Sequence, residues 1–467
     1  MKKSKRSSRR EFLSQLTLGA AAVSVPGILT ASSRKTREIE IPHRRAEKKK
    51  YAANDKIRLA TIGYGIQGTG DTAGAVEVDG VEFVAACDLY DGRLQNAKER
   101  YGNDIFTTRD YREILSRKDI DAVIIAVPDH WHQRIGIDAM KAKKAVYLEK
   151  PMIKRWEDGQ SIIDAEKANN AILQIGSQGI SGLADEKARE LYLGGAIGDL
   201  IMVEIYNDRY SAEGAWQYPI PPDASPNTID FDTFLGTAPK VPFDPTRFFR
   251  WRNYQDYGTG VAGDLFVHSF TSLHYVIDSH GPVRAVSTGG TRFWKDGRDV
   301  PDIMLSMYDF PQTKTHPAFN AILRINFTAG NGGGGGFRLI GSEGEISLGY
   351  QGVTVKKQKL GMTPNGYSLK AYSKAMRDEI VKEYEAKYAD YERSMNPPEE
   401  VVYNPPKDYK GADYDHFVTF FNAMRGDNKI RENATYGLRA AGAALLSNYS
   451  YFGKKIVNWD PENMKLL

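Results

Sequence analysis

Largely apolar runs alternate with longer segments of mixed polarity through the first third of the chain. The runs span Lys56–Ile62, Val81–Cys87, Ile120–Val127 and Ala145–Leu148. Runs of this length are typical of strands buried on both faces, and their separation by segments of helical length indicates βαβ units. The pattern therefore predicts a parallel sheet covered by helices over residues 56–175.

The loop after the first run reads Gly-Tyr-Gly-Ile-Gln-Gly at positions 63–68. Gly63 allows a tight turn, Gly65 lets the backbone approach a pyrophosphate, and Gly68 lets helix and strand pack closely. Asp88 ends the second run, where a carboxylate accepts ribose hydroxyls and repels a 2′-phosphate. A strand, a glycine loop, a helix, a second strand and an acidic residue follow one another in this order, which predicts a dinucleotide-binding site. They favour NAD over NADP, although Arg93 could tolerate a phosphate.

Polar residues also follow the third and fourth runs, as Pro-Asp-His-Trp-His at 128–132 and Glu-Lys-Pro at 149–151. Ligands of open α/β sheets bind outside the carboxyl ends of the strands, so both segments should face the cofactor crevice. His130 and His132 lack a third metal ligand nearby and are interpreted as loop or cofactor contacts. Lys150, partly desolvated and neutral, could bind a substrate hydroxyl, with Glu149 as its ion partner. The alternative is a structural Lys–Glu pair.

Asp264 and His268 form a second candidate pair, because Asp264–Ile277 is predicted to be helical and i, i+4 residues share one face. A histidine is a good general base near neutral pH, and a neighbouring carboxylate fixes its tautomer and stabilises the imidazolium. Such a pair fits the removal of a hydroxyl proton, although surface and capping pairs have the same spacing. His274 lies elsewhere on the helix, and we expect it to be structural or at the pocket rim.

Aromatic residues are concentrated between Tyr206 and Tyr257, with twelve in 52 residues. Several prolines and four arginines accompany them, among them Arg209 and Arg252. Sugars present apolar C–H faces and hydroxyl rims that suit aromatic platforms with polar neighbours. The segment therefore predicts either a carbohydrate pocket or a long loop packed on a sheet.

Three further segments carry no chemical signature. The glycine run at 331–336 cannot form a stable strand alone, so we expect it to bend a strand or to let another chain approach. Residues Ala371–Met395 predict a charged amphipathic helix that resembles an insertion, and Tyr414–Tyr451 predicts two alanine-rich closing helices.

The N-terminus resembles an export signal for folded proteins. Twin arginines at 9 and 10 precede a small-residue apolar stretch, Leu16–Leu29, that is too short and too weakly apolar for a permanent membrane span. We expect residues 1–31 to be a Tat signal peptide and the protein to be periplasmic. Residues 32–55 are expected to be a charged arm, either a flexible linker or a segment that wraps a neighbouring subunit.

The charge and the cysteine content of the chain bear on its partners and on disulfide bonding. Six of the 63 basic residues and one of the 59 acidic residues lie in the first 31 positions, so the mature chain is close to neutral. This balance favours neither nucleic acid nor a membrane surface as a partner. Cys87 is the only cysteine, which excludes an intramolecular disulfide.

The chain from about Lys56 to Asp460 resembles the Gfo/Idh/MocA oxidoreductases, the family of glucose-fructose oxidoreductase and inositol dehydrogenase. The resemblance rests on the glycine loop, Asp88, the segments at 127–132 and 149–151, and Gly258–His268. It implies an α/β protein: an N-terminal Rossmann domain (56–175) and a C-terminal α/β domain (176–467) with a large, mostly antiparallel sheet. That second domain would carry substrate specificity and the contacts of a dimer or tetramer.

The resemblance also implies roles for individual residues. His268 would be the acid/base, Asp264 would orient it or bind substrate, and Lys150 would complete the site. The residues expected to contact NAD are Gly63, Gly65, Ile66, Gln67, Gly68, Asp88, Pro128, His132, Glu149 and Lys150. The residues expected to contact substrate are Trp216, Tyr218, Trp251, Arg252 and His274, and no metal is expected.

Three functions fit these expectations. The first is oxidation of a carbinol of a sugar, polyol or glycoside, such as a C3 hydroxyl, with a tightly retained NAD that a second sugar reoxidises. The second is a redox-neutral NAD-dependent glycosidase that works by oxidation, elimination, addition and reduction, and that needs a further base such as Tyr206, Tyr210 or His274. The third is non-catalytic sugar binding, which the intact set of Lys150, Asp264 and His268 disfavours.

Overall fold

The computed structural model describes residues 36–43, 51–52, 55–349, 352–358, 360–394, 399–427 and 429–467. The predicted signal peptide, and with it the twin arginines, lies outside these residues. Within them, no helix has both the length and the apolar character needed to cross a membrane.

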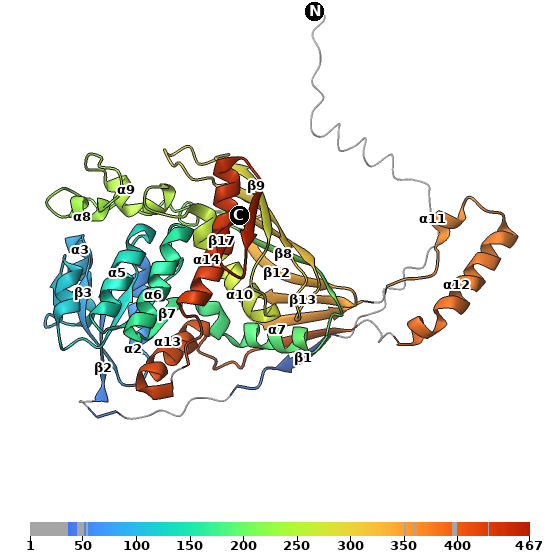
Figure 1. The fold of residues 1–467 in the computed structure, drawn as a ribbon, viewed down its shortest axis with the longest axis horizontal. Coiled ribbons are helices and arrows are strands. Elements are labelled where there is room, and N and C mark those ends of the chain that lie inside the picture. The colour runs from blue at the N-terminus through green and yellow to red at the C-terminus, as the bar shows by residue number, and fades with distance from the viewer. Residues whose placement is uncertain are drawn as a thin grey trace, which may run out of the picture. The chain divides into compact units, whose positions relative to one another are not determined.

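The N-terminal half forms the predicted parallel sheet (Figure 1). Its six strands are ordered β4-β3-β2-β5-β6-β7, and every neighbouring pair is parallel. The strands are β2 (Ile57–Ile62), β3 (Val81–Cys87), β4 (Phe106–Thr108), β5 (Ala122–Ile125), β6 (Ala145–Glu149) and β7 (Leu173–Gly176). The helices of this half are α2 (Ile66–Val76), α3 (Asp91–Tyr101), α4 (Tyr111–Ser116), α5 (Asp129–Lys141) and α6 (Gly159–Asn169). The strand order reverses between β2 and β5, which opens a crevice at their carboxyl ends.

The C-terminal half is built on one mixed sheet of eleven strands, ordered β1-β15-β14-β13-β12-β8-β11-β10-β9-β16-β17. All neighbours are antiparallel except β1–β15 and β8–β11. The strands are β1 (Thr36–Glu40), β8 (Leu200–Asp208), β9 (Arg284–Gly290), β10 (Ile303–Phe310), β11 (Phe319–Asn326), β12 (Gly334–Gly341), β13 (Gly344–Gly349), β14 (Gly352–Lys357), β15 (Glu400–Asn404), β16 (Val457–Asp460) and β17 (Lys465–Leu466). The predicted fold class, a Rossmann domain followed by an α/β domain with a mostly antiparallel sheet, is confirmed.

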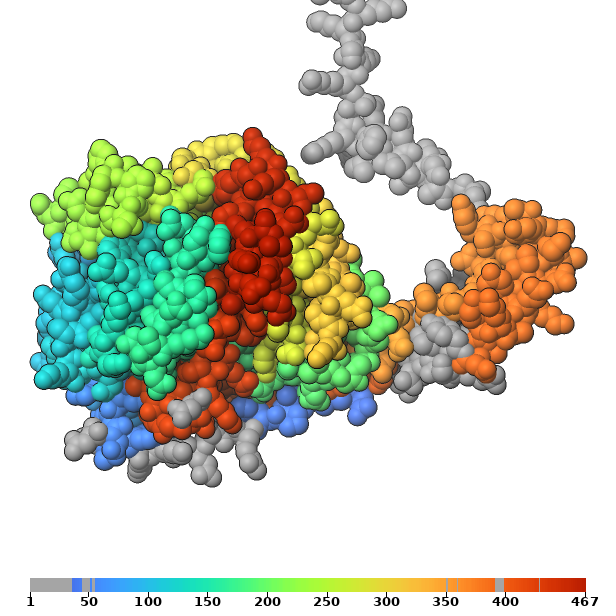
Figure 2. All heavy atoms as spheres, in the orientation of Figure 1, coloured from blue at the N-terminus to red at the C-terminus, as the bar shows by residue number. Residues whose placement is uncertain are grey.

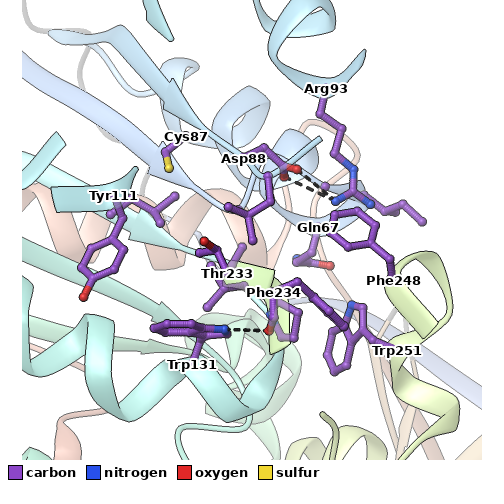
Figure 3. A pocket seen from close by; sticks show the side chains of 18 of the residues that line it. Gln67, Cys87, Asp88, Arg93, Tyr111, Trp131, Thr233, Phe234, Phe248 and Trp251 are labelled. Carbon is purple, nitrogen blue, oxygen red and sulfur yellow. Dashed lines mark hydrogen bonds and ion pairs between the residues drawn. The ribbon is translucent and has the colours of Figure 1, made fainter. Parts of the chain in front are cut away.

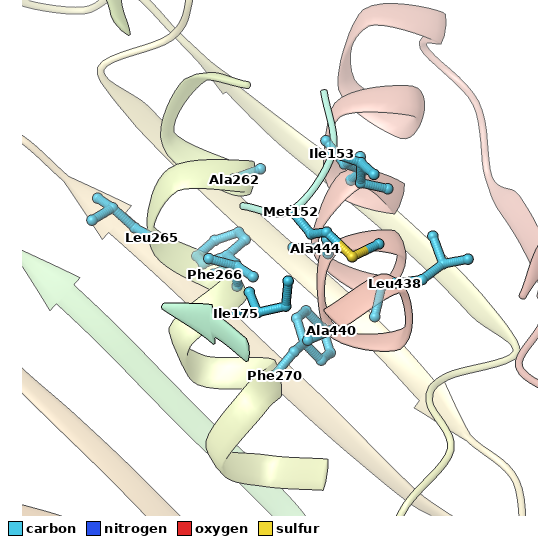
Figure 4. Packing of buried hydrophobic residues seen from close by; sticks show 14 of the residues in the cluster. Met152, Ile153, Ile175, Ala262, Leu265, Phe266, Phe270, Leu438, Ala440 and Ala444 are labelled. Carbon is cyan, nitrogen blue, oxygen red and sulfur yellow. The ribbon is translucent and has the colours of Figure 1, made fainter. Parts of the chain in front are cut away.

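Helices α7 (Leu183–Leu193), α10 (Val267–Ile277) and α14 (Ala434–Gly453) pack on one face of this sheet. Helix α14 packs against α10, and Ala440, Ala444, Phe266 and Phe270 belong to the buried cluster at this contact (Figure 4). Met152 and Ile175 of the Rossmann half belong to the same buried cluster. The two halves therefore share one hydrophobic core, which fixes the end of β6 against α10. Helix α13 (Ala412–Asn422) packs on the Rossmann half through Phe417, which stacks on Tyr147.

Two expectations are corrected by the sheet. The charged arm is not only a linker, because Thr36–Glu40 pairs with Glu400–Asn404 of the same chain and extends the sheet by one strand. The glycine run does not merely bend a strand, because β12 begins within it and Gly334–Gly336 pair with Tyr206–Asp208 of β8. A Cβ on Gly336 would clash with the Tyr206 ring, so the missing side chain lets this aromatic cover the strand.

Helix α12 (Lys374–Ser394) corresponds to the predicted charged helix. No side chain described in it is buried. It therefore adds nothing to the core that holds the site.

Candidate functional site

The glycine loop has the geometry that dinucleotide binding requires. Gly63 has a φ of +88°, and a Cβ there would lie 2.6 Å from the carbonyl oxygen of Ala126. A Cβ on Gly68 would clash with the carbonyl oxygen of Gly63. Helix α2 begins directly after Gly65, so its first backbone N–H groups face the crevice and can bind a phosphate. Gln67 donates a 2.8 Å hydrogen bond to Asp71, and the Ile66 side chain is exposed at the loop tip.

Asp88 lies at the end of β3, on the rim of the crevice. Arg93 donates hydrogen bonds of 3.3 and 3.4 Å to its two carboxylate oxygens (Figure 3). The Arg93 guanidinium also lies 5.5 Å from the ring of Phe248 and 5.4 Å from that of Phe249. Arg93 is therefore held by Asp88 and by two rings of the other half of the chain.

A cavity of about 890 Å³, counted with the solvent at its mouth, occupies this crevice. One wall comes from the Rossmann half and includes Gly63, Gly65, Ile66, Gln67, Asp88, Arg93 and Pro128. The other comes from the C-terminal half: Tyr218, Thr233, Phe234, Phe248, Phe249, Trp251 and Arg252. Of the residues predicted to contact NAD, those of the glycine loop except Gly68, together with Asp88 and Pro128, line this cavity.

Residues 217–257, here called the covering segment, connect the large sheet to the crevice. They contain α8 (Phe231–Leu235) and α9 (Pro245–Phe249) and lie against the Rossmann half (Figures 1 and 2). Asp230 donates its backbone N–H to Leu89, and Asp91 donates its own to Thr228. Trp131 donates its indole N–H to the carbonyl oxygen of Phe234 at 3.0 Å. The covering segment is thus attached to the Rossmann half at several points.

His130 serves these attachments, whereas His132 makes its contacts within the Rossmann half. His130 Nε2 lies 2.8 Å from the same Phe234 carbonyl oxygen. His132 is buried between the carbonyl oxygens of Val127 and Pro151, and burial lowers its pKa to about 4. His132 therefore joins the ends of β5 and β6 behind the cavity wall, and the expected cofactor contact is corrected to a structural one.

Most aromatics of the 206–257 region pack on one another rather than forming a sugar platform. Phe231, Phe234, Phe248, Tyr254 and Tyr257 belong to one buried cluster over the crevice. Trp216 is 1% exposed and packs edge-on against Phe327 in the core, so it is corrected from substrate contact to core residue. His274 is likewise buried in the core, outside the cavity lining. Tyr218, Trp251 and Arg252 do line the cavity.

Lys150 and Asp264 meet across the two halves of the chain. The Lys150 ammonium donates to the carbonyl oxygen of Asp264 at 3.0 Å and to its carboxylate Oδ1 at 3.2 Å. Arg252 Nε donates to the same Oδ1 at 3.2 Å. Burial alone would raise the pKa of Asp264, but Lys150, Arg252 and Arg209 outweigh burial and lower the pKa well below its usual value. Asp264 is therefore an ionised carboxylate shared by two cations.

The predicted link between Asp264 and His268 is not a hydrogen bond. Asp264 lies in a π-helical turn, Ala262–Phe266, and His268 lies in the α-helix that follows, so the wider turn changes the i, i+4 geometry. No hydrogen bond engages the His268 ring in the part of the chain that the structure describes. Burial and then the charge of Lys150 lower its pKa to about 3, while Asp264 opposes them. The ring is therefore a neutral imidazole that can accept a proton.

Glu149 does not pair with the Lys150 ammonium, contrary to expectation. It accepts the backbone N–H of Lys150 at 3.2 Å and the side-chain amide of Gln178 at 2.9 Å. Burial raises the pKa of Glu149 to about 7, against the opposing charge of Lys150. Glu149 thus fixes the backbone from which Lys150 reaches Asp264.

Sequence reasoning missed two kinds of residue. Gln178 holds Glu149 and carries no motif by which it could be found. Phe248 and Phe249 line the cofactor crevice, and the aromatic enrichment around them was the available signal. Among the described residues, no three His, Cys, Asp or Glu side chains gather as metal ligands.

Comparison with known proteins agrees with both halves of this site. Residues 57–177 match the NAD-binding Rossmann fold of the Gfo/Idh/MocA oxidoreductase family, and residues 203–289 match the C-terminal alpha/beta domain of the same family. Inositol 2-dehydrogenase of Salmonella typhimurium is 30% identical over 167 residues, which are 35% of this chain and 49% of that enzyme. The match thus spans about half of the relative.

A second relative and a solved structure extend the comparison. A glycosyl hydrolase family 109 protein of Shewanella sp. (strain MR-4) is 33% identical over 116 residues, 23% of this chain and 25% of that protein. Levoglucosan dehydrogenase in complex with NADH and levoglucosan has the same fold, with a TM-score of 0.61 at 17% identity over 86% of this chain and 99% of that one.

Proposed function

The chain belongs to the Gfo/Idh/MocA oxidoreductase family through both of its domains, and on this premise we propose that it oxidises a carbinol of a sugar, polyol or glycoside with NAD. The observation that carries the proposal is the ion pair between Lys150 and Asp264, which act electrostatically on His268 and are joined to the glycine-loop crevice through Arg252. The named relatives support a sugar or polyol as substrate, since one is an inositol 2-dehydrogenase.

The crevice residues fit NAD. Cβ atoms on Gly63 and Gly68 would fill space at the turn, and the first turn of α2 can hold a pyrophosphate. When bound, NAD supplies the hydride acceptor. His268, neutral and without a protein partner among the described residues, takes the hydroxyl proton of the carbinol. Lys150 uses two protons of its ammonium on Asp264 and can donate the third to the same hydroxyl. Asp264 holds Lys150 and Arg252 in place.

We also propose that the protein is exported by the Tat pathway to the periplasm with its cofactor bound and retained. Dinucleotides are scarce outside the cytoplasm, so a released NADH would not be reoxidised there. The covering segment supports retention, because Phe234, Phe248 and Phe249 form a wall of the cofactor crevice. A second sugar would then take the hydride back.

Retention makes a specific prediction for Phe248 and Phe249. Replacing both with alanine removes the two rings that face Arg93 and opens the crevice. We expect bound NAD to dissociate about 10- to 100-fold faster, from the loss of two buried aromatic contacts. The measurement is the NAD content of the purified protein and its decay during dialysis. Phe293→Ala, at an exposed ring elsewhere, is the matched control, and equal NAD retention in both variants would contradict the role of the covering segment.

NAD rather than NADP is the proposed cofactor, because Asp88 would lie against a 2′-phosphate. Replacing Asp88 with serine removes this repulsion and frees Arg93, which now bonds both Asp88 oxygens. We expect the affinity for NADP to rise about 10-fold or more and that for NAD to fall, because charged hydrogen bonds change partners. Titration of cofactor-free protein with each nucleotide measures both. An unchanged NAD/NADP ratio would place the ribose elsewhere.

A redox-neutral glycosidase is the second candidate, supported by the match to a glycosyl hydrolase family 109 protein. Oxidation at a sugar C3 would acidify the C2–H bond, and a further base would then be needed. Tyr206 is on the outer face of the sheet beside Arg324, and His274 is buried in the core, so neither fits. Tyr218 lines the cavity, and no hydrogen bond engages its hydroxyl among the residues described, so it is the better candidate.

The uncovered face of the large sheet supports a homo-oligomer. Val286, Met307 and Ile322 are cross-strand neighbours on β9, β10 and β11, and all three are exposed. Leu305 on β10 continues this apolar surface. We propose that a second copy covers it, in a dimer or tetramer, and the mass in solution tests this directly.

The proposed function is tested on the protein as purified from the periplasm, without added cofactor. Absorbance spectra are recorded before and after mixing with a panel of sugars, polyols and aryl glycosides. A bound nicotinamide that one sugar reduces and another reoxidises is the expected result. Aryl-glycoside cleavage without net reduction would favour the glycosidase. A protein that holds no nucleotide and responds to no sugar would overturn the proposal.

A further inference from the structure

The catalytic end of the cavity carries more positive than negative charge. Lys150, Arg252 and Arg209 gather around Asp264, and Asp264 is the only described carboxylate that any of them bonds. The side chains of Lys150 and Asp264 are 11% and 9% exposed. Asp264 therefore bonds two cations, Lys150 and Arg252, in a largely desolvated place, and Arg209 acts on it only through its charge.

Other acids do not restore the balance. Asp129 is buried and bonded to Thr259, and burial raises its pKa to about 7. Glu149 is buried behind Lys150, and its pKa is also about 7. Glu213, which influences Tyr218, is exposed to solvent. Near neutral pH Asp129 and Glu149 are therefore only partly ionised and offset less positive charge than two full carboxylates would.

The two arginines have donors to spare. Arg252 uses Nε on Asp264, and its Nη1 and Nη2 have no protein partner among the residues described. Its guanidinium lies 4.2 Å from the Trp251 ring centre, which fixes its plane, and both residues line the cavity. Arg209 donates Nη1 to the carbonyl oxygen of Gly214 and stacks on Phe327, and it has no carboxylate partner in the described chain. A planar guanidinium held in this way can donate two hydrogen bonds to one oxyanion.

Unpaired cations in a desolvated cavity are costly unless a ligand supplies the counter-charge. We propose that the substrate is an anionic sugar, one that carries a carboxylate or a phosphate, and that Arg252, which lines the cavity, binds this group while the charge of Arg209 strengthens the attraction. The proposal rests on the proposed function and names the substrate class of the same site. Burial is the main cause of the low pKa of His268, and the charges of Lys150 and Arg209 lower it further; a bound anion would offset this second contribution and make the ring a better proton acceptor.

The pyrophosphate of NAD is the competing source of negative charge. Its site is the first turn of α2, after Gly65. Arg252 is bonded instead to Asp264, which in turn holds Lys150 at the end of β6. The free Nη groups of Arg252 therefore belong to the substrate end of the cavity.

The test compares matched pairs of sugars on the NAD-loaded protein. Glucuronate with glucose and galacturonate with galactose vary the carboxylate, and glucose 6-phosphate varies the anion. We expect kcat/KM for at least one anionic sugar to exceed that of its neutral partner by about 10-fold or more, since charged hydrogen bonds carry this much. Which anion is preferred distinguishes carboxylate from phosphate. Equal or better use of every neutral partner would overturn the inference and leave the proposed function standing.

Substitutions of single arginines test which side chain causes the preference for the anionic sugar. Arg209→Gln and Arg252→Gln should each lower kcat/KM for the anionic sugar about 10- to 100-fold, mainly through KM, and change the neutral sugar less. Arg252→Lys keeps the charge and should recover part of the loss. Arg112→Gln removes a guanidinium from an exposed pair on the Rossmann surface and should change neither sugar. Equal losses for both sugars, together with a lower NAD content, would assign Arg252 to the cofactor instead.

A binding measurement separates this inference from the proposed function. If no sugar reduces the bound NAD, the proposed function fails. Glucuronate, galacturonate or glucose 6-phosphate should still raise the melting temperature of the NAD-loaded protein, and less so in Arg209→Gln. The absence of any such shift would overturn the inference as well.

Discussion

Replacing His268 with alanine should slow reduction of the bound cofactor by about 10²–10⁴-fold, the usual contribution of a positioned acid/base. No hydrogen bond from the described residues occupies the ring, so its loss removes a proton acceptor and leaves the core intact. The measurement is the rate of nicotinamide absorbance change in a single turnover with the best sugar. NAD content and melting temperature should stay close to those of the unchanged protein.

The pKa of His268 also predicts how turnover should change with pH. Burial and Lys150 lower the pKa of His268 to about 3, so the free enzyme holds the basic form of the ring at every pH above that value. The basic form is lost only as the pH falls through about 3, and a bound anion would move this limit upward. Turnover that is unchanged in His268→Ala would remove the residue from the chemistry and favour sugar binding without catalysis.

The cofactor half of the site could be predicted because its determinants are local. A glycine loop between a buried strand and a helix permits one backbone path, and Gly63 and Gly68 show the close approaches that require glycine. Asp88 follows from the end of the next strand. Each of these residues lies within one βαβ unit, so sequence spacing and spatial position are nearly the same information.

For the catalytic half, the sequence indicated which residues take part but not which of them form pairs. Lys150 meets Asp264 across 114 positions of sequence, so its partner could not be identified from the neighbouring Glu149. Likewise, the spacing of Asp264 and His268 indicated a pair, but a π-helical turn between them gives the carboxylate to Lys150 and Arg252 instead. The spacing of residues along the chain cannot show which cation, distant in sequence, pairs with the carboxylate of Asp264.

The aromatic region shows the same limit. Trp216 and Trp251 are the same residue type in the same segment, yet one is a core residue and the other lines the cavity. Their positions are decided by where the covering segment attaches to the Rossmann half, through Trp131 and the backbone of Leu89. Those attachments are long-range, and composition cannot place them.

Replacing Asp264 with asparagine should destabilise the fold as well as reduce turnover. The change keeps the volume but leaves Lys150 and Arg252 without a counter-ion at side-chain exposures of 11% and 22%. Breaking one partner from a buried ion pair costs about 3–5 kcal/mol, and the lower figure fits here because Arg252 faces the cavity. Urea denaturation of the NAD-free protein measures the loss. Asp110→Asn, which breaks an exposed pair with Arg112, is the control and should cost about 1 kcal/mol or less.

The pH dependence of this loss has a definite direction. The folded pKa of Asp264 is lowered, so its stabilisation is complete above the unfolded value, about pH 4, and is lost as the pH falls below it. The contribution of the Asp264 carboxylate to the stability gap between the two proteins should therefore narrow in acid. Removing a cation as well, in Asp264→Asn with Arg252→Gln, should restore part of the stability and none of the activity. A cost no greater than that of Asp110→Asn would mean that solvent already compensates these cations, and the case for an anionic substrate would weaken with it.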